Sequence, residues 1–243
     1  TCTLGNQKTA KHRILAVGNS SAAAFVPAFD DIVRHDEYAV TITAAWSASP
    51  LGGIPNHSEW SRANDYYWQH VVPPLIATLK PGDWVFLMSD LTDFSPQSPT
   101  LGSAYNLRRF EDGLTALARD LQSKRIRLAV LHGLPFMHEA ICTPAMAAPQ
   151  WFAPFGRPCT LYSKGETLTR RNGLHDMLIK LQNRGYLTVV DLMPVFCADE
   201  VCGYYSHDGI PLYRDEWGHT SVEAARLSGR LIRAHLAATE QSS

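Results

Sequence analysis

Short apolar runs alternate along the chain with longer stretches that have helical periodicity. The runs are almost wholly apolar and rich in β-branched residues, which is typical of parallel strands that are covered on both faces. They predict five strands, at residues 14–17, 39–43, 84–88, 127–131 and 187–191.

The stretches between these runs predict helices. Apolar residues recur at spacings of three and four from Leu107 to Leu121 and from Leu174 to Leu181, the second set followed by a Gly185 stop, and a last helix is predicted over 221–236. The β-α-β alternation predicts an α/β fold of three layers around a five-stranded parallel sheet, in one domain that covers 1–243. Segments 47–56 and 143–164 are rich in Pro, Gly and Ser, and we expect them to lie over the ends of the sheet.

Composition excludes several classes of protein. With 243 residues, 45% of them hydrophobic, the chain can bury an ordinary core. A formal net charge of −1, without a Lys/Arg-rich run, gives no general attraction for nucleic acid. No apolar stretch approaches the roughly 18 residues of a membrane helix, and any targeting signal is expected to have been removed or to lie upstream of Thr1.

The five cysteines indicate a compartment. No pair forms a CxxC motif and none has zinc spacing with a histidine, so we expect no metal site. Cys142 with Cys159, and Cys197 with Cys202, could each close a short disulfide loop, which would indicate an oxidising compartment. Buried free thiols in a cytosolic enzyme are the alternative, and the odd Cys2 fits either that or a partner outside this segment.

The first candidate for chemistry is Ser20, in the turn after the first predicted strand. Gly18 permits a tight strand-to-helix turn, and Ser20 would then lie at a helix amino end that favours developing negative charge. This is a suitable position for a nucleophile. The alternative is that Ser20 only caps the helix.

The second candidate is His219, close to the other end of the chain. Thr220 and Glu223 have the spacing of a capping box, which would place His219 just before the last helix. A carboxylate from Asp215 or Glu216 could hold the imidazole in one tautomer. The alternative is a surface turn in which the histidine is incidental.

These two motifs resemble the first and last blocks of the SGNH/GDSL hydrolase superfamily. More closely, the chain is similar to the extracytoplasmic SGNH domain fused to acyltransferase-3 (AT3) membrane proteins, which O-acylate cell-surface polysaccharides. The resemblance extends from Cys2 to Gly229 and includes Gly-Asn-Ser-Ser at 18–21, the run 191–202 with its two cysteines, and Leu-Tyr-Arg-Asp at 212–215 followed by Gly-His-Thr-Ser. It implies the three-layer SGNH-hydrolase (flavodoxin-like) fold.

The resemblance implies a triad of Ser20, His219 and Asp215. The family usually spaces its acid as D-x-x-H, whereas Asp215 lies four residues before His219; the preceding Tyr-Arg favours Asp215, and Glu216 is the alternative acid. The implied oxyanion donors are Ser20, Gly53 (or its neighbour Gly52) and the position of Asp90, where the family has Asn. An ionised Asp90 would repel an oxyanion, which leaves that work to backbone N–H groups.

The resemblance also implies a function. Ser20 would form an acyl-enzyme and pass the acyl group, expected to be acetyl, to a polysaccharide acceptor. No cofactor is expected: the AT3 membrane domain, upstream in the same chain, would supply acyl groups from acyl-CoA, and the SGNH domain would be periplasmic and tethered to the inner membrane. A stand-alone carbohydrate esterase and a non-catalytic glycan-binding domain are the alternatives. Trp46, Trp60, Trp68, Trp151 and Trp217 could stack on sugar rings or serve as core anchors. Cys142–Cys159 and Cys197–Cys202 are the expected disulfides, with Cys2 free.

Overall fold

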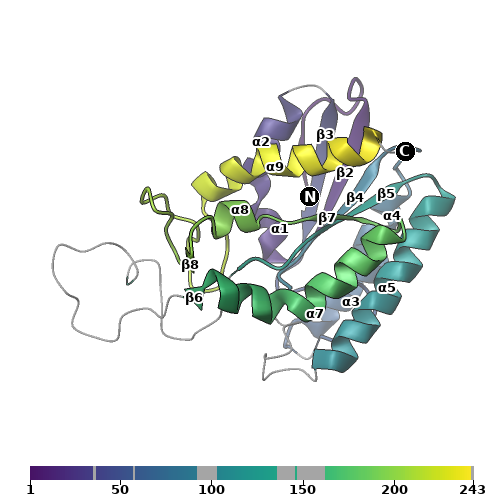
Figure 1. Ribbon diagram of the computed structural model, residues 1–243. Helices are drawn as coiled ribbons and strands as arrows, with labels where there is room; N and C mark the ends of the chain where they lie inside the picture. Colours follow the sequence, from purple (N-terminus) through teal and green to yellow (C-terminus); the bar gives the residue numbers. More distant parts are fainter. Residues whose placement is uncertain (35–36, 57, 92–102, 136–145, 147–161, 242–243) are drawn as a thin grey trace.

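The computed structural model describes residues 1–34, 37–56, 58–91, 103–135, 146 and 162–241 (Figure 1). Helices and strands alternate along most of this length. Their bounds are β1 Cys2–Leu4, β2 His12–Gly18, α1 Ser20–Ala24, α2 Val26–Val33, β3 Tyr38–Ala44, α3 Ser61–Tyr66, the π-helical turn η1 Tyr67–Val71, α4 Val72–Ile76, β4 Trp84–Met88, α5 Ser103–Ser123, β5 Arg127–Leu131, β6 Tyr162–Ser163, α7 Lys164–Asn183, β7 Thr188–Val190, α8 Met193–Phe196, β8 Val201–Cys202 and α9 Val222–Gln241.

The main sheet has six strands in the order β1-β3-β2-β4-β5-β7. The last five are mutually parallel and correspond to the five predicted strands. β1 adds an antiparallel edge next to β3, with Cys2 opposite Ile42. The predicted five-stranded parallel sheet is therefore corrected to a mixed sheet of six. β1 has only three residues and is largely exposed, so it lacks the apolar run that marks the other strands.

Side chains alternate between the two faces of the sheet, because successive residues of a strand point to opposite sides. On β2, Ile14 and Ala16 pack against α2 and α9, whereas Leu15 and Val17 pack against α5 and α7. Figure 1 shows α2 and α9 next to each other over the first face, and they make extensive contact. The result is a helix-sheet-helix sandwich with all five parallel strands ending at the same edge.

The two predicted long helices are confirmed and extend beyond their apolar repeats. α7 begins with a capping box, in which Ser163 Oγ accepts from the Glu166 N–H and the Glu166 carboxylate accepts from the Ser163 N–H. It ends before Gly185, whose φ of 72° is the left-handed conformation expected of a glycine stop.

The two irregular segments differ in what the structure describes. Segment 47–56 is anchored, because Leu51 and Ile54 are buried in the core beneath α5. Most of segment 143–164 lies outside the described residues.

Candidate active site

The turn at residues 18–20, called the nucleophile turn below because it carries the candidate nucleophile Ser20, begins where β2 closely approaches β4. A Cβ on Gly18 would lie 2.0 Å from the carbonyl oxygen of Met88, so only glycine fits at the end of β2. Tyr67 braces the same turn: its hydroxyl accepts from the Gly18 N–H (3.2 Å) and donates to the Thr43 carbonyl (2.8 Å). Burial raises the pKa of Tyr67 to about 12, which keeps this hydroxyl protonated and able to donate.

Asn19 caps the helix that follows the turn. Its Oδ1 accepts from the Ser21 N–H at 3.0 Å and from the Asp90 N–H at 3.4 Å. Ser20 is the first residue of α1 and is not the capping residue. The alternative interpretation of Ser20, as a simple cap, is therefore wrong, and its hydroxyl is available for another contact.

The loop at residues 213–220, called the histidine loop below because it carries His219, is closed at its base by antiparallel pairing. Tyr213 pairs with Thr220, and the Arg214 N–H donates to the His219 carbonyl at 2.9 Å. Within the loop, Asp215 Oδ1 accepts from the N–H groups of Trp217 and His219, both at 3.1 Å. The turn is completed by Gly218 with φ 76°, a conformation that favours glycine. These bonds fix the Asp215 carboxylate under the imidazole.

The structure brings Ser20, His219 and Asp215 together in one hydrogen-bonded line. His219 Nε2 lies 2.7 Å from Ser20 Oγ, and His219 Nδ1 lies 2.7 Å from Asp215 Oδ2. His219 is buried, whereas Ser20 and Asp215 are half-buried. A carboxylate on Nδ1 holds the proton there and leaves the Nε2 lone pair facing the hydroxyl, which is the arrangement a general base requires.

Glu216, the alternative acid, lies elsewhere. It is exposed, and the imidazole nitrogen is bound by Asp215 instead. Its charge acts on Tyr204: burial raises the pKa of that phenol, and the carboxylates of Glu216 and Asp215 raise it further. The one-residue longer spacing is accommodated because the Asp215 side chain folds back onto the two loop N–H groups.

One local prediction beside His219 is wrong. The expected capping box of Thr220 and Glu223 does not form at the start of α9. Instead, Ser221 Oγ accepts from the Ala224 N–H at 2.9 Å and serves as the cap. Thr220 and Ser221 are adjacent and both residue types are favoured caps, so the sequence alone does not fix which of the two caps the helix.

The expected oxyanion residues are only partly assembled. Asp90 lies against the nucleophile turn through its bond to Asn19, and it lines a small hollow with Ser89 and Gly218. Ser89 Oγ is buried there and has no hydrogen-bond partner in the described residues. Gly53 has φ 82°, and its carbonyl accepts from the Arg109 guanidinium at 3.3 Å; no hydrogen bond of the described residues links it to Ser20.

The tryptophans divide between surface and interior. Trp217, two residues before His219, is 65% exposed, and Trp46 and Trp60 are also exposed. Trp68 is half-buried, with its indole N–H on the Ser49 carbonyl at 3.1 Å. Trp151 lies outside the described residues. Trp217 is therefore the tryptophan whose open ring face lies on the histidine loop itself.

The cysteine predictions are confirmed where the structure describes them. Cys197 and Cys202 form a disulfide between the end of α8 and β8, and Cys2 is an exposed free thiol. Cys142 and Cys159 lie outside the described residues.

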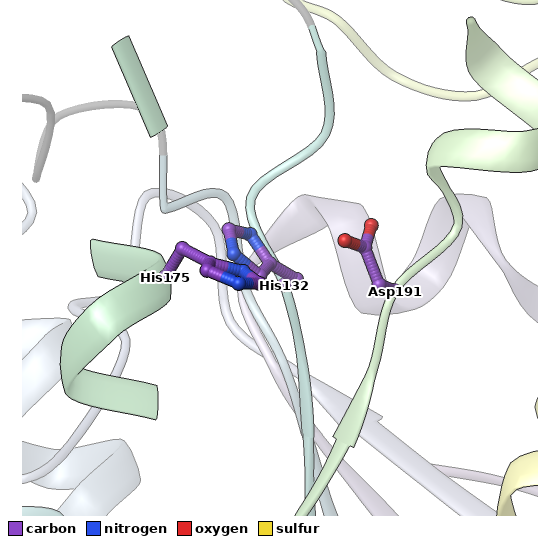
Figure 2. A group of neighbouring side chains, drawn as sticks. All are labelled: His132, His175 and Asp191. Carbon is purple, nitrogen blue, oxygen red and sulfur yellow. The ribbon is translucent and has the colours of Figure 1, made fainter. Parts of the chain in front are cut away.

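A second polar group lies at the edge of the sheet where the parallel strands end, beginning two strands away from β2. Figure 2 shows His132, His175 and Asp191 converging after β5 and β7. Burial lowers the pKa of His132 to about 4, with a further contribution from the Arg171 guanidinium. Although burial alone would raise it, the pKa of Asp191 is lowered by Arg171, His132 and its hydrogen bonds. Sequence analysis missed this group, because its members lie on separate elements and match no motif spacing.

Comparison with known proteins places the fold in a family. A family model described as "SGNH domain (fused to AT3 domains)" matches residues 1–234. A search of curated proteins finds no match. Among the described helices, none is both long and apolar enough to cross a membrane.

Two solved structures illustrate the similarity. The periplasmic domain of a lipopolysaccharide acetyltransferase from Salmonella ser. Paratyphi A has a TM-score of 0.67 and 13% identity, over 92% of this chain and 83% of that chain. An acetylxylan esterase from Geobacillus stearothermophilus has a TM-score of 0.52 and 14% identity, over 93% and 94%. At these identities the likeness concerns the fold. The match over almost the whole sequence shows that this chain belongs to the family of SGNH domains that are fused to AT3 domains.

Proposed function

We propose that this domain transfers an acyl group, expected to be acetyl, to a hydroxyl of a cell-surface polysaccharide through a Ser20 acyl-enzyme. The observation that carries the proposal is the unbroken line of hydrogen bonds from Asp215 through His219 to Ser20. Membership of the AT3-fused family supports a donor that is delivered by an upstream membrane domain from acyl-CoA, and a periplasmic location.

The first half of the reaction forms the acyl-enzyme. Ser20 Oγ attacks the carbonyl carbon of the donor while its proton passes to His219 Nε2. Asp215 stabilises the imidazolium that results. The tetrahedral intermediate then collapses, the bond to the leaving group breaks, and the leaving group takes the proton from Nε2.

The second half transfers the acyl group. An acceptor hydroxyl gives its proton to His219 Nε2 and attacks the ester carbonyl, and Ser20 Oγ leaves with that proton. The negative charge of each intermediate lies near the amino end of α1. Ser20 is the first residue of α1, so its backbone N–H is the proposed oxyanion donor. Asp90 lines the hollow beside Ser21, and an ionised carboxylate there would repel the charge, which leaves the work to backbone N–H groups.

The acceptor is proposed to be a sugar because of the surface next to His219. An open indole such as Trp217 can stack on the apolar face of a pyranose. The chain's formal net charge of −1 also gives no general attraction for a polyanion. If water replaces the sugar, the same residues hydrolyse the acyl-enzyme, which is the esterase alternative.

The test separates nucleophile, acceptor and fold. The purified domain is labelled with a fluorophosphonate, and peptide mapping identifies the labelled serine; we expect label on Ser20 that is lost in Ser20→Ala and kept in Ser123→Ala, a remote helix serine. In cells, Ser20→Ala in the full-length protein should abolish O-acetylation of the surface glycan, measured by NMR. Retained O-acetylation would overturn the proposal, and release of acetate from an acetylated glycan by the isolated domain would favour the esterase. Glycan binding with no labelled serine would favour a non-catalytic domain.

A further inference from the structure

His132, His175 and Asp191 come from three elements that are distant in sequence. His132 follows β5, Asp191 follows β7, and His175 lies on α7 (Figure 2). One ligand atom of each lies within 4.8 Å of the others. β5 and β7 are hydrogen-bonded neighbours, and the His132 N–H donates to the Val190 carbonyl at 2.9 Å, so two of the three side chains are held by the sheet itself.

His132 has an unused nitrogen in a buried position. The residue is 1% exposed, and its Nδ1 lies 3.3 Å from the Gly133 carbonyl, a contact that places the ring proton on Nδ1. Its Nε2 has no hydrogen-bond partner in the described residues. Leaving a buried acceptor unpaired is energetically unfavourable. A cation on Nε2 would recover this cost.

Asp191 is already oriented by neighbours that use only one of its oxygens. Oδ1 accepts from the Arg171 guanidinium at 2.7 Å and from the Met193 N–H at 3.0 Å. Oδ2 carries no hydrogen bond in the described residues. Ligating carboxylates in metal sites are held in this way by outer hydrogen bonds.

We propose that His132, His175 and Asp191 form a binding site for a divalent first-row transition-metal ion, such as Zn²⁺. Two imidazoles and one carboxylate suit these ions, whereas Mg²⁺ and Ca²⁺ prefer oxygen ligands. In a tetrahedral zinc site the ligand atoms are about 3.4 Å apart, so ligand atoms that are up to 4.8 Å apart must approach by up to about 1.4 Å. His175 is exposed and can make this movement. The Arg171 charge opposes the ion, so the affinity should be weaker than that of a closed structural zinc site.

The bound ion would have a structural consequence. It would join α7 to the carboxyl ends of β5 and β7, on the edge of the sheet that also carries Ser20. Three protein ligands leave a fourth position open to water or to another ligand. The site is separate from the Ser20 triad and does not depend on the proposed acyl transfer.

The test uses the domain without a polyhistidine tag, after treatment with EDTA. Isothermal titration with ZnCl₂ should show one site, MgCl₂ should show none, and Co²⁺ should develop the visible absorption bands of nitrogen coordination. His175→Ala removes an exposed ligand without opening the core, and it should weaken Zn²⁺ binding at least ~10-fold. His70→Ala, which removes another exposed helix histidine, should bind Zn²⁺ like the unchanged protein.

A further variant excludes the triad as the metal site. His219→Ala should keep full Zn²⁺ affinity, because His219 is not part of the proposed metal site. The proposal is overturned if the protein binds no Zn²⁺, if His175→Ala binds as tightly as the unchanged protein, or if His219→Ala loses the binding instead.

Discussion

Replacing Asp215 by Asn tests the role of the carboxylate without removing the loop's internal bonds. The Asn Oδ1 can still accept from the N–H groups of Trp217 and His219, so the loop should keep its shape. The new amide NH₂ takes the place of Oδ2 and donates to His219 Nδ1. The ring proton then moves to Nε2, which can no longer accept the proton of Ser20.

The expected effect is large. A wrong imidazole tautomer in a Ser-His-Asp triad lowers the rate about 10⁴-fold, which corresponds to about 5 kcal/mol in the barrier. The assay is the rate constant for labelling by a fluorophosphonate, because it reports the nucleophilicity of Ser20 and needs no knowledge of the natural acceptor. Circular dichroism of the variant checks that the fold is kept.

Glu216→Gln is the matched control, since it neutralises the neighbouring carboxylate that does not contact the imidazole. It should label at the unchanged rate. If Asp215→Asn labels within a few-fold of the unchanged protein, or if Glu216→Gln slows as much as Asp215→Asn, the assignment of the acid is wrong.

Three further predictions concern stability. Gly18→Ala should destabilise the fold by several kcal/mol and slow the labelling of Ser20, because the new Cβ would displace the Met88 carbonyl. Thermal unfolding and the labelling rate measure the two effects, and an unchanged melting temperature would contradict the close approach of β2 and β4. In EDTA, the free energy of unfolding should fall by on the order of 3 kcal/mol as the pH is lowered from about 6.5 to about 4, because His132 takes up a proton in the unfolded chain but not in the folded one. Urea unfolding across this pH range measures the fall, and His132→Gln, if it folds, should show a smaller change of stability with pH. Replacing Cys197 and Cys202 by Ser should cost about 2 kcal/mol for so short a loop, measured by urea unfolding. Dithiothreitol should then destabilise the variant less than it destabilises the unchanged protein, and the remaining effect would come from the expected Cys142–Cys159 disulfide.

The parallel part of the fold could be predicted because each of its strands is a buried run bounded by turn residues. β4 and β5 match the predicted bounds, whereas β7 is one residue shorter at each end than predicted. β1 could not be predicted, because its stability comes from pairing with β3 and not from its own apolar content. The local sequence pattern carries no information about a strand partner that is 36 residues away or more.

The site shows the same division. Ser20 and His219 could be proposed because each lies in a recognisable turn, but their 2.7 Å contact depends on the whole sheet. The choice between Asp215 and Glu216 required the loop's hydrogen bonds, which spacing alone does not determine. His132, His175 and Asp191 have no shared motif, so only the packing of α7 against the sheet brings them together.

The candidate triad joins an early and a late part of this sequence, because Ser20 and His219 are 199 positions apart. During synthesis the nucleophile turn is made long before its base, and β2 can pair with β3 and β4 while the histidine loop is still absent. In the proposed mechanism Ser20 would therefore remain an ordinary alcohol until the segment with His219 has docked and α9 has packed across α2. The proposed acylation would therefore be available only in a chain that extends through His219 and α9, and a molecule truncated before them by a ribosome stall or a protease would be inert.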